Sequence, residues 1–266
     1  MSRIESTFAK LKAEKRRALV IFLTAGDPDI ETTVRLVLAA KKAGADIVEL
    51  GVPFSDPLAD GPVIQESFHR AIKRGASLTK VLAAVKKIRE QTDVPLVFML
   101  ASTLIINHGV NKFMRQCAEA GVDGIIIPDA PLEEIDEFAP SAKDHGLDII
   151  MLAAPTSPSQ RLKQIAARSS GFVYYISVAG VTGNKLASAT EAGKGIKALK
   201  KTTRLPVCAG FGVTGPEQAR QMSAVADGVI IGSQAVRVIN SAGSPEQAVR
   251  ELSKFVSSVR RAMDKK

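Results

Sequence analysis

The sequence has no tryptophan and only two tyrosines among its 266 residues, so it offers few aromatic surfaces on which nucleic-acid bases could stack. It also has only two cysteines, Cys117 and Cys208, which lie far apart and in no metal-ligand spacing. They predict neither a disulfide framework nor a zinc site, but buried thiols in a reducing compartment. No apolar run reaches the length of a membrane span or of a signal-peptide core. The sequence therefore predicts a cytoplasmic protein.

The composition is that of a folded chain with an excess of positive charge. Apolar residues make up 45% and charged residues 24%, which excludes a disordered chain. The 36 Lys and Arg exceed the 27 Asp and Glu, giving a net charge of +9. Such an excess makes nucleic acid, a membrane surface or a phosphorylated substrate candidate partners. The basic residues are spread in pairs such as Lys41-Lys42 and Lys86-Lys87, whereas a nucleic-acid-binding protein would cluster them in a stripe.

One short pattern recurs along the chain: a small residue, a glycine, an acid and then several aliphatic residues. It occurs at 43–48 and 120–127, with degenerate copies at 145–150 and 226–231. The pattern is typical of a helix that ends on a left-handed glycine, a tight polar turn and a buried strand. The chain thus reads as a series of repeated βα units.

Continuous apolar runs predict eight buried strands, beginning near Ala18, Asp46, Pro95, Gly124, Asp148, Phe172, Pro206 and Asp227. Amphipathic stretches that predict helices follow them, at 31–43, 77–91, 110–120, 131–144, 158–168, 189–202, 216–222 and 245–263. The mean step is about 30 residues, the size of one βα unit. We therefore predict a single (β/α)8 TIM-barrel domain over residues 1–266, with an extra leading helix at 2–14. The alternative is an open doubly wound sheet, which usually has fewer strands.

Two connections are longer than the others, at 53–76 and 179–193. Both follow the carboxyl end of a predicted strand, which is the face of a TIM barrel where the chemistry takes place. The proline-rich segment 53–62 and the segment 179–193 are therefore predicted to be active-site loops.

Glu49 is a carboxylate within the otherwise aliphatic second strand. Strand alternation allows it to point into the barrel, where burial would raise its pKa towards the range of a general acid or base. The alternative is an outward-facing glutamate paired with a lysine.

Asp60 lies just before Gly61-Pro62, where a helix could begin. It is either a helix N-cap or an Asx turn, or else a second carboxylate facing Glu49. Spacing alone does not decide between these two interpretations.

Glycine-bearing turns late in the chain predict a phosphate site. They include Gly183 in one turn, Gly212 in the next, and Gly232 with Ser233 in the last. The last two turns follow the seventh and eighth predicted strands, where barrels commonly bind phosphate with backbone N–H groups and a helix N-terminus.

The run from Glu49 to Pro62 closely resembles the signature of the tryptophan synthase alpha chain. Matches at 22–28, 121–124, 180–183, 210–212 and 232–233 extend this resemblance over the whole chain. The resemblance implies a carbon–carbon lyase of L-tryptophan biosynthesis. Such an enzyme cleaves indole-3-glycerol phosphate to indole and glyceraldehyde 3-phosphate by a retro-aldol reaction, with no metal or organic cofactor in this chain.

The resemblance also assigns roles to residues. It implies that Glu49 is the general acid and base, and that Asp60 holds the indole N–H and stabilises positive charge on the ring. Thr182 is implied to close the mobile loop against Asp60. Tyr174 matches a family tyrosine near Glu49. The implied indole pocket is formed by Phe22, Ile126, Leu152 and Phe211. The implied phosphate cradle is formed by Gly183, Gly212, Gly232 and Ser233.

The implied partner is a tryptophan synthase beta chain that bears pyridoxal phosphate and receives indole through a tunnel in an alpha2-beta2 heterotetramer. The segment 97–106 departs from the family pattern, with Thr103 where an asparagine is usual. This departure bears on the beta-chain interface. An alternative function is a phosphate-ligand-binding barrel that acts mainly as a regulatory subunit of the beta chain.

Overall fold

The structure is a computed structural model, and it describes residues 1–57, 59–176, 189–210 and 212–265, with only the backbone at 189–191. Its strands are β1 Ala18–Thr24, β2 Ile47–Gly51, β3 Leu96–Met99, β4 Gly124–Ile126, β5 Asp148–Ile149, β6 Leu152–Ala153, β7 Val173–Ile176, β8 Val207–Gly210 and β9 Gly228–Ile231. Its helices are α1 Arg3–Ala13, α2 Ile30–Lys42, α3 Pro62–Lys73, α4 Leu78–Arg89, α5 Ser102–His108, α6 Val110–Ala120, the 3-10 turn η1 Ile135–Glu137, α7 Ala139–Asp144, α8 Ser159–Arg168, α9 Ala189–Lys200, α10 Pro216–Ser223, α11 Ser233–Asn240 and α12 Pro245–Asp264.

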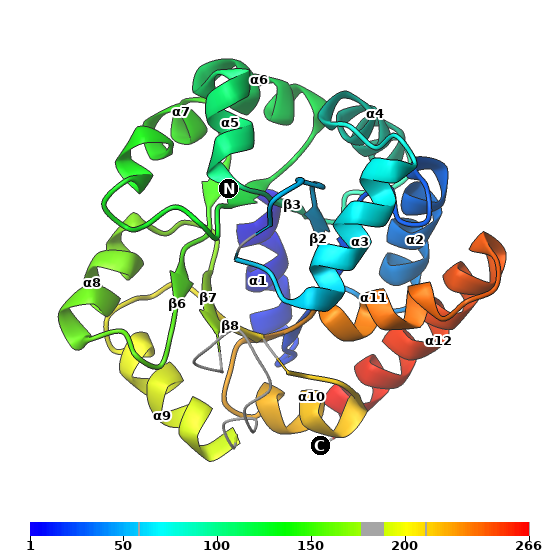
Figure 1. Cartoon of the computed structure of the whole chain (residues 1–266). Helices are drawn as coiled ribbons and strands as arrows, with labels where there is room; N and C mark the ends of the chain where they lie inside the picture. Colours follow the sequence, from blue (N-terminus) through cyan, green and yellow to red (C-terminus); the bar gives the residue numbers. More distant parts are fainter. Residues whose placement is uncertain (58, 177–188, 211, 266) are drawn as a thin grey trace.

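The strands form one parallel sheet in the order β5-β4-β3-β2-β1-β9-β8-β7-β6. The two edge strands, β5 and β6, are successive parts of the segment 148–153, so the chain itself closes the ring. Figure 1 looks along this barrel, with the helices surrounding the strands. The predicted TIM barrel is confirmed, whereas the fifth predicted strand is divided into two short ones.

Most of the predicted helices are present around the sheet. The differences are three helices that were not predicted, one predicted helix that is divided, and one predicted loop that is partly helical. The connection 53–76 contains α3, and two further short helices, α5 and α11, follow β3 and β9. The helix predicted at 131–144 is divided into η1 and α7, because Pro140 lacks an N–H and is tolerated only in the first turn of α7. Within the predicted active-site loop 179–193, residues 189–193 belong to α9, and 179–188 lie outside the described residues.

The leading helix, predicted at 2–14, is α1. It begins with a capping box in which Ser2 and Glu5 satisfy each other's backbone N–H groups. Its apolar face, Ile4, Phe8 and Leu11, packs into the amino-terminal end of the barrel. In Figure 1 α1 lies across the centre of the ring. The helix therefore closes one end of the barrel and leaves the other for the site.

The acid of the sequence repeat has a structural function. In three copies its carboxylate accepts a hydrogen bond from the backbone N–H at or next to the start of a neighbouring strand. These pairs are Asp46 with Leu19 (2.8 Å), Asp123 with Leu96 (2.8 Å) and Asp227 with Val207 (3.0 Å). Each of the three also pairs with a basic side chain, from Arg260, Arg89 and Lys200 respectively. The repeated acids thus tie adjacent strands together at the amino-terminal end of the barrel.

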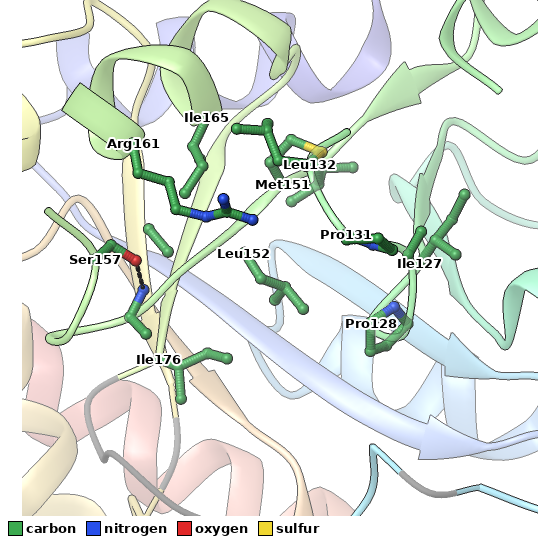
Figure 2. Close-up of a pocket in the computed structure, with 14 residues that line it drawn as sticks. Ile127, Pro128, Pro131, Leu132, Met151, Leu152, Ser157, Arg161, Ile165 and Ile176 are labelled. Carbon is green, nitrogen blue, oxygen red and sulfur yellow. Dashed lines mark hydrogen bonds between the residues drawn. The ribbon is translucent and has the colours of Figure 1, made fainter. Parts of the chain in front are cut away.

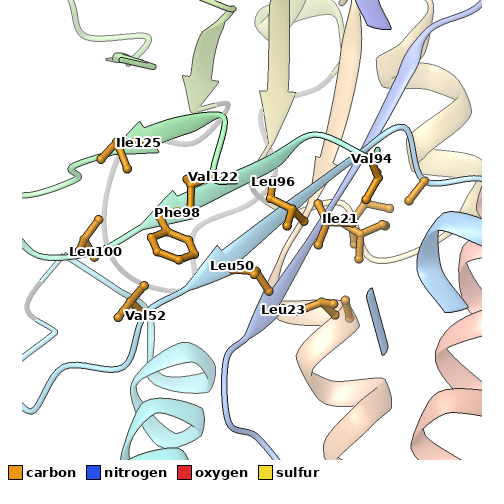
Figure 3. Close-up of a cluster of buried hydrophobic side chains, with 14 of the residues drawn as sticks. Ile21, Leu23, Leu50, Val52, Val94, Leu96, Phe98, Leu100, Val122 and Ile125 are labelled. Carbon is orange, nitrogen blue, oxygen red and sulfur yellow. The ribbon is translucent and has the colours of Figure 1, made fainter. Parts of the chain in front are cut away.

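Alternate residues of each strand face opposite sides of the sheet. The outward side chains pack under the helices, and Figure 3 shows this layer at β1 to β4, with Ile21, Leu50 and Phe98 among its members. The inward side chains form a second core that includes Val20, Ile47 and Val97. Because residue 47 faces inward, residue 49 does so too.

None of the described helices combines the length and the apolar composition needed to span a bilayer.

Candidate active site

Glu49 lies on β2 and points into the barrel, where its side chain is 1% exposed. Its strand pairs with β1 on one side and β3 on the other, so that Phe22 and Val97 flank it in register. No group of the described residues hydrogen-bonds to Oε2 of Glu49. Burial and, second, the negative charge of Asp60 raise the pKa of Glu49 to about 8. The inward orientation predicted from alternation is confirmed, and the outward alternative is wrong.

Asp60 lies in the loop between β2 and α3. The residue that caps α3 is Gly61, and no side chain accepts a hydrogen bond at that cap. The loop is held by Gln65, whose amide donates to the backbone carbonyl oxygens of Asp60 (2.8 Å) and Pro57 (3.2 Å). The helix N-cap interpretation of Asp60 is therefore wrong. Burial and, second, the negative charge of Asp129 raise the pKa of Asp60 to about 6.

A cavity of about 250 Å³ adjoins Asp60. Its wall is mostly apolar, with acidic groups at a few points. The lining residues are Phe54, Asp56, Pro57, Ala59, Asp60, Phe68, Met99, Leu100, Ala101, Thr103, Pro128 and Asp129. An apolar wall with a few carboxylates suits a flat apolar ligand that carries a hydrogen-bond donor.

Tyr174 extends from β7 into the inner core. Its pKa is raised well above 10 by burial and, to a smaller extent, by the charges of Glu49 and Asp60. The side chain is therefore a neutral phenol. Its hydroxyl oxygen lies so close to Gly210 that a Cβ added there would be 2.7 Å from it. Tyr174 thus lies near both carboxylates, whereas the resemblance implied a position near Glu49 only.

The described apolar residues predicted for the ligand pocket lie on β1, β4 and β6, which are not adjacent in the sheet, and none of them lines the cavity beside Asp60. Phe22 is 2% exposed and packs with Phe68, whereas Ile126 is fully buried in the inner core. Leu152 is half-buried and lines a second cavity, of about 160 Å³, at the break between β5 and β6 (Figure 2). Pro128 lines both cavities, so the two are neighbours.

Only some residues of the predicted phosphate site lie within the part of the chain that the structure describes. Gly232 is the N-cap residue of α11, which begins at Ser233, and no side chain among the described residues caps it. A Cβ added at Gly232 would lie 3.7 Å from Cβ of Phe22, so the N-terminus of α11 opens beside the apolar pocket. Gly212 has a φ of +80°, which favours glycine. The other predicted residues of this site and of the closing loop, Thr182, Gly183 and Phe211, lie outside the described residues.

Asp129 was not predicted as a site residue. Only its position directly after the fourth strand could have signalled it, since barrel sites are built from such positions.

Asp27, which follows β1, is buried but paired with Arg70 (2.7 Å) and Arg74 (3.5 Å), and it thereby anchors α3. Among the described residues, no group of three or more His, Cys, Asp and Glu side chains is arranged to hold a metal ion.

The fold and two carboxyl groups with raised pKa values, the buried Glu49 and the half-buried Asp60, define the class of this protein. It is a (β/α)8 barrel with these carboxyl groups towards the carboxyl ends of its strands. A family model described as "Tryptophan synthase alpha chain" matches residues 8–264. The chain therefore belongs to the tryptophan synthase alpha chain family.

Individual relatives agree with this assignment. The chain is 46% identical over 260 residues to the tryptophan synthase alpha chain of Geotalea daltonii, covering 98% of each chain. A crystal structure of tryptophan synthase subunit alpha from Legionella pneumophila has a TM-score of 0.92 and 36% identity, with 99% of each chain covered. A chain in a structure of tryptophan synthase from M. tuberculosis in its aminoacrylate-bound form has a TM-score of 0.88 and 31% identity, covering 99% of this chain and 100% of that one.

Proposed function

We propose that this chain is the alpha subunit of a tryptophan synthase. In this proposal it cleaves indole-3-glycerol phosphate to indole and glyceraldehyde 3-phosphate, a carbon–carbon lyase reaction. The observation that supports this most is Glu49, a buried carboxyl group whose Oε2 has no partner among the described residues. Such a group is costly to bury and is typical of a site where a proton is transferred.

Glu49 performs both proton transfers in this proposal. With a pKa of about 8 it is protonated at neutral pH and can donate its proton to C3 of the indole ring. The ring becomes an indolenine with positive charge on nitrogen. The Glu49 carboxylate then removes the proton of the adjacent glycerol hydroxyl while the carbon–carbon bond breaks. The bonding electrons return to the ring, the hydroxyl becomes the aldehyde, and Glu49 ends protonated.

Asp60 supplies the opposing charge. Its pKa of about 6 leaves it ionised at neutral pH, so it can accept the indole N–H and stabilise the positive charge that develops on the ring. At neutral pH Glu49 is therefore protonated, as a proton donor requires, while Asp60 is ionised, as stabilisation of a positive charge requires.

The remaining site residues bind the substrate. Phe22, Ile126, Leu152 and Phe211, with Tyr174 beside Glu49, hold the indole ring. Gly183, Gly212, Gly232 and Ser233 bind the phosphate through backbone N–H groups, with the N-terminus of α11 favouring its charge. Thr182 closes the loop against Asp60 and excludes water.

The partner in this proposal is a beta chain, with which the chain forms an alpha2-beta2 heterotetramer and to which it passes indole. This chain itself uses no cofactor, and pyridoxal phosphate belongs to the beta chain. The cytoplasm is the proposed compartment. The two thiols, Cys117 and Cys208, are buried and free, as suits a reducing environment.

The test is the release of indole from indole-3-glycerol phosphate by the purified chain, measured with and without a beta chain. Turnover that depends on Glu49 supports the lyase. Binding of the phosphate ligand with no indole release in either condition would instead favour the regulatory subunit. That alternative is disfavoured by the intact pair of Glu49 and Asp60.

A further inference from the structure

Asp129, in the turn after β4, caps a helix that is distant in sequence. Its carboxylate accepts hydrogen bonds from the backbone N–H of Ser102 at 2.9 and 3.1 Å, and from Oγ of Ser102 at 3.0 Å. The N-cap residue of α5, Ala101, makes no such bond with its own side chain. Asp129 therefore takes the place of a local cap and ties the β4 turn to the start of α5.

The segment fixed by Asp129 is part of the cavity beside Asp60. Leu100, Ala101 and Thr103 line that cavity, and so does Asp129 itself. The contact with Ser102 thus fixes the position of the cavity wall and of the Asp129 carboxylate together.

The charge of Asp129 also acts on Asp60. Like charges oppose each other's ionisation, and Asp129 is the second cause, after burial, of the raised pKa of Asp60. Three other titratable groups face Asp60: Glu49 on β2, Asp56 on its own loop, which lines the same cavity, and Tyr174 on β7. At neutral pH Glu49 and Tyr174 are protonated, which leaves Asp56 and Asp129 as the neighbouring carboxylates. Of these two, Asp129 is the one held in place from outside the Asp60 loop.

We propose that Asp129 is a positioning residue for the cavity beside Asp60: it fixes the cavity wall through Ser102, and its negative charge adds to that of Asp60 in attracting a cationic ring nitrogen. A second carboxylate adds to the negative potential at the site, and a developing positive charge is stabilised by it. The identity of the ligand in this inference rests on the proposed function. The effect of the Asp129 charge on the ionisation of Asp60 does not depend on it.

The test compares two variants. Asp129→Asn removes the charge and keeps an oxygen that can accept from Ser102, whereas Ser102→Ala keeps the charge and the backbone hydrogen bond. The first measurement is the titration of the Asp60 carboxyl carbon by NMR, which needs no turnover. The second is the pH dependence of kcat/KM for indole-3-glycerol phosphate.

In Asp129→Asn both the Asp60 titration and the acidic limb of kcat/KM are expected to move down by about 0.2 to 0.7 pH units, the size typical of an exposed charge pair. Ser102→Ala is expected to leave both in place. High salt should move the wild-type titration in the same direction as Asp129→Asn, because Asp129 is exposed and its charge is screened.

An Asp60 titration that is the same in Asp129→Asn and in the wild type would overturn the inference. If Asp129→Asn does not fold, Asp129→Ser, which also removes the charge and keeps an oxygen that can accept from Ser102, gives the same decision. If the chain releases no indole, the proposed function fails, and the NMR titration still decides whether Asp129 acts on Asp60.

Discussion

The ring of Phe22 lies directly on the backbone of Gly51. A Cβ added at Gly51 would be 2.8 Å from Cε2 of Phe22 and 2.9 Å from Cε1 of Phe68. Phe22 and Gly51 lie on the paired strands β1 and β2, close to Glu49, so the absence of a side chain at position 51 sets where the Phe22 ring lies. One glycine thus shapes the apolar side of the proposed substrate pocket.

The substitution Gly51→Ala should therefore displace the Phe22 ring. We expect a loss of stability of about 1–3 kcal/mol, typical of overpacking a core, and a raised KM for indole-3-glycerol phosphate. Urea unfolding and steady-state kinetics measure the two effects. Gly61→Ala is the matched control, since a Cβ there meets no atom of the described residues within 4 Å. Equal effects of the two substitutions would contradict the role of Gly51.

The substitution Glu49→Gln should abolish cleavage and leave ligand binding nearly unchanged. The amide keeps the shape of the side chain but can neither donate the proton to C3 nor remove one from the hydroxyl. We expect turnover to fall by about 10²–10⁴-fold or more, since one group performs two transfers. Indole release and the affinity for a phosphate ligand such as glycerol 3-phosphate are the measurements. Near-wild-type cleavage would rule out the assignment of Glu49.

The pH dependence of kcat/KM should be bell-shaped. Activity requires Asp60 ionised and Glu49 protonated, so it should rise through a pKa of about 6 and fall through one of about 8. Since the two groups interact, the limbs report the pair rather than either residue alone. Activity that keeps increasing above pH 8 would show that Glu49 starts the reaction ionised.

The raised pKa of Glu49 also predicts how stability depends on pH. The ordinary pKa of a solvated glutamate is 4.5, and that of Glu49 in the folded chain is about 8. Below pH 4.5 the group is protonated in both the folded and the unfolded state and has no effect. Between these values the unfolded state loses its proton and the folded state keeps it, so stability falls as pH rises.

Glu49→Gln should remove this dependence. We expect the variant to be more stable than the wild type by on the order of 2–4 kcal/mol near pH 8, with no such gain near pH 4.5. Urea unfolding at the two pH values measures the difference. A constant difference between variant and wild type across this range would indicate that Glu49 is ionised in the folded chain.

Local periodicity in the sequence determined most of the secondary structure and the inward orientation of Glu49. The aliphatic run around Glu49 predicts a strand, and the period of two places Glu49 on the same face as Ile47, which is inside the barrel. The repeated acids predict tight turns, and Asp46, Asp123 and Asp227 lie directly before β2, β4 and β9, where each bonds to a neighbouring strand. Short helices such as α5 and α11 were missed because 7 and 8 residues give too little periodicity to recognise.

Only the tertiary structure decided how distant segments meet. Spacing left Asp60 undecided between a cap and a site residue, and the structure rules out the helix cap because Gly61 caps α3. Asp129 reaches Ser102 across 27 positions of sequence because β3 and β4 are neighbours in the sheet. Local sequence sets the direction of a side chain along its own strand. The groups that face it depend on the closure of the barrel, because that closure brings loops from different strands to one end.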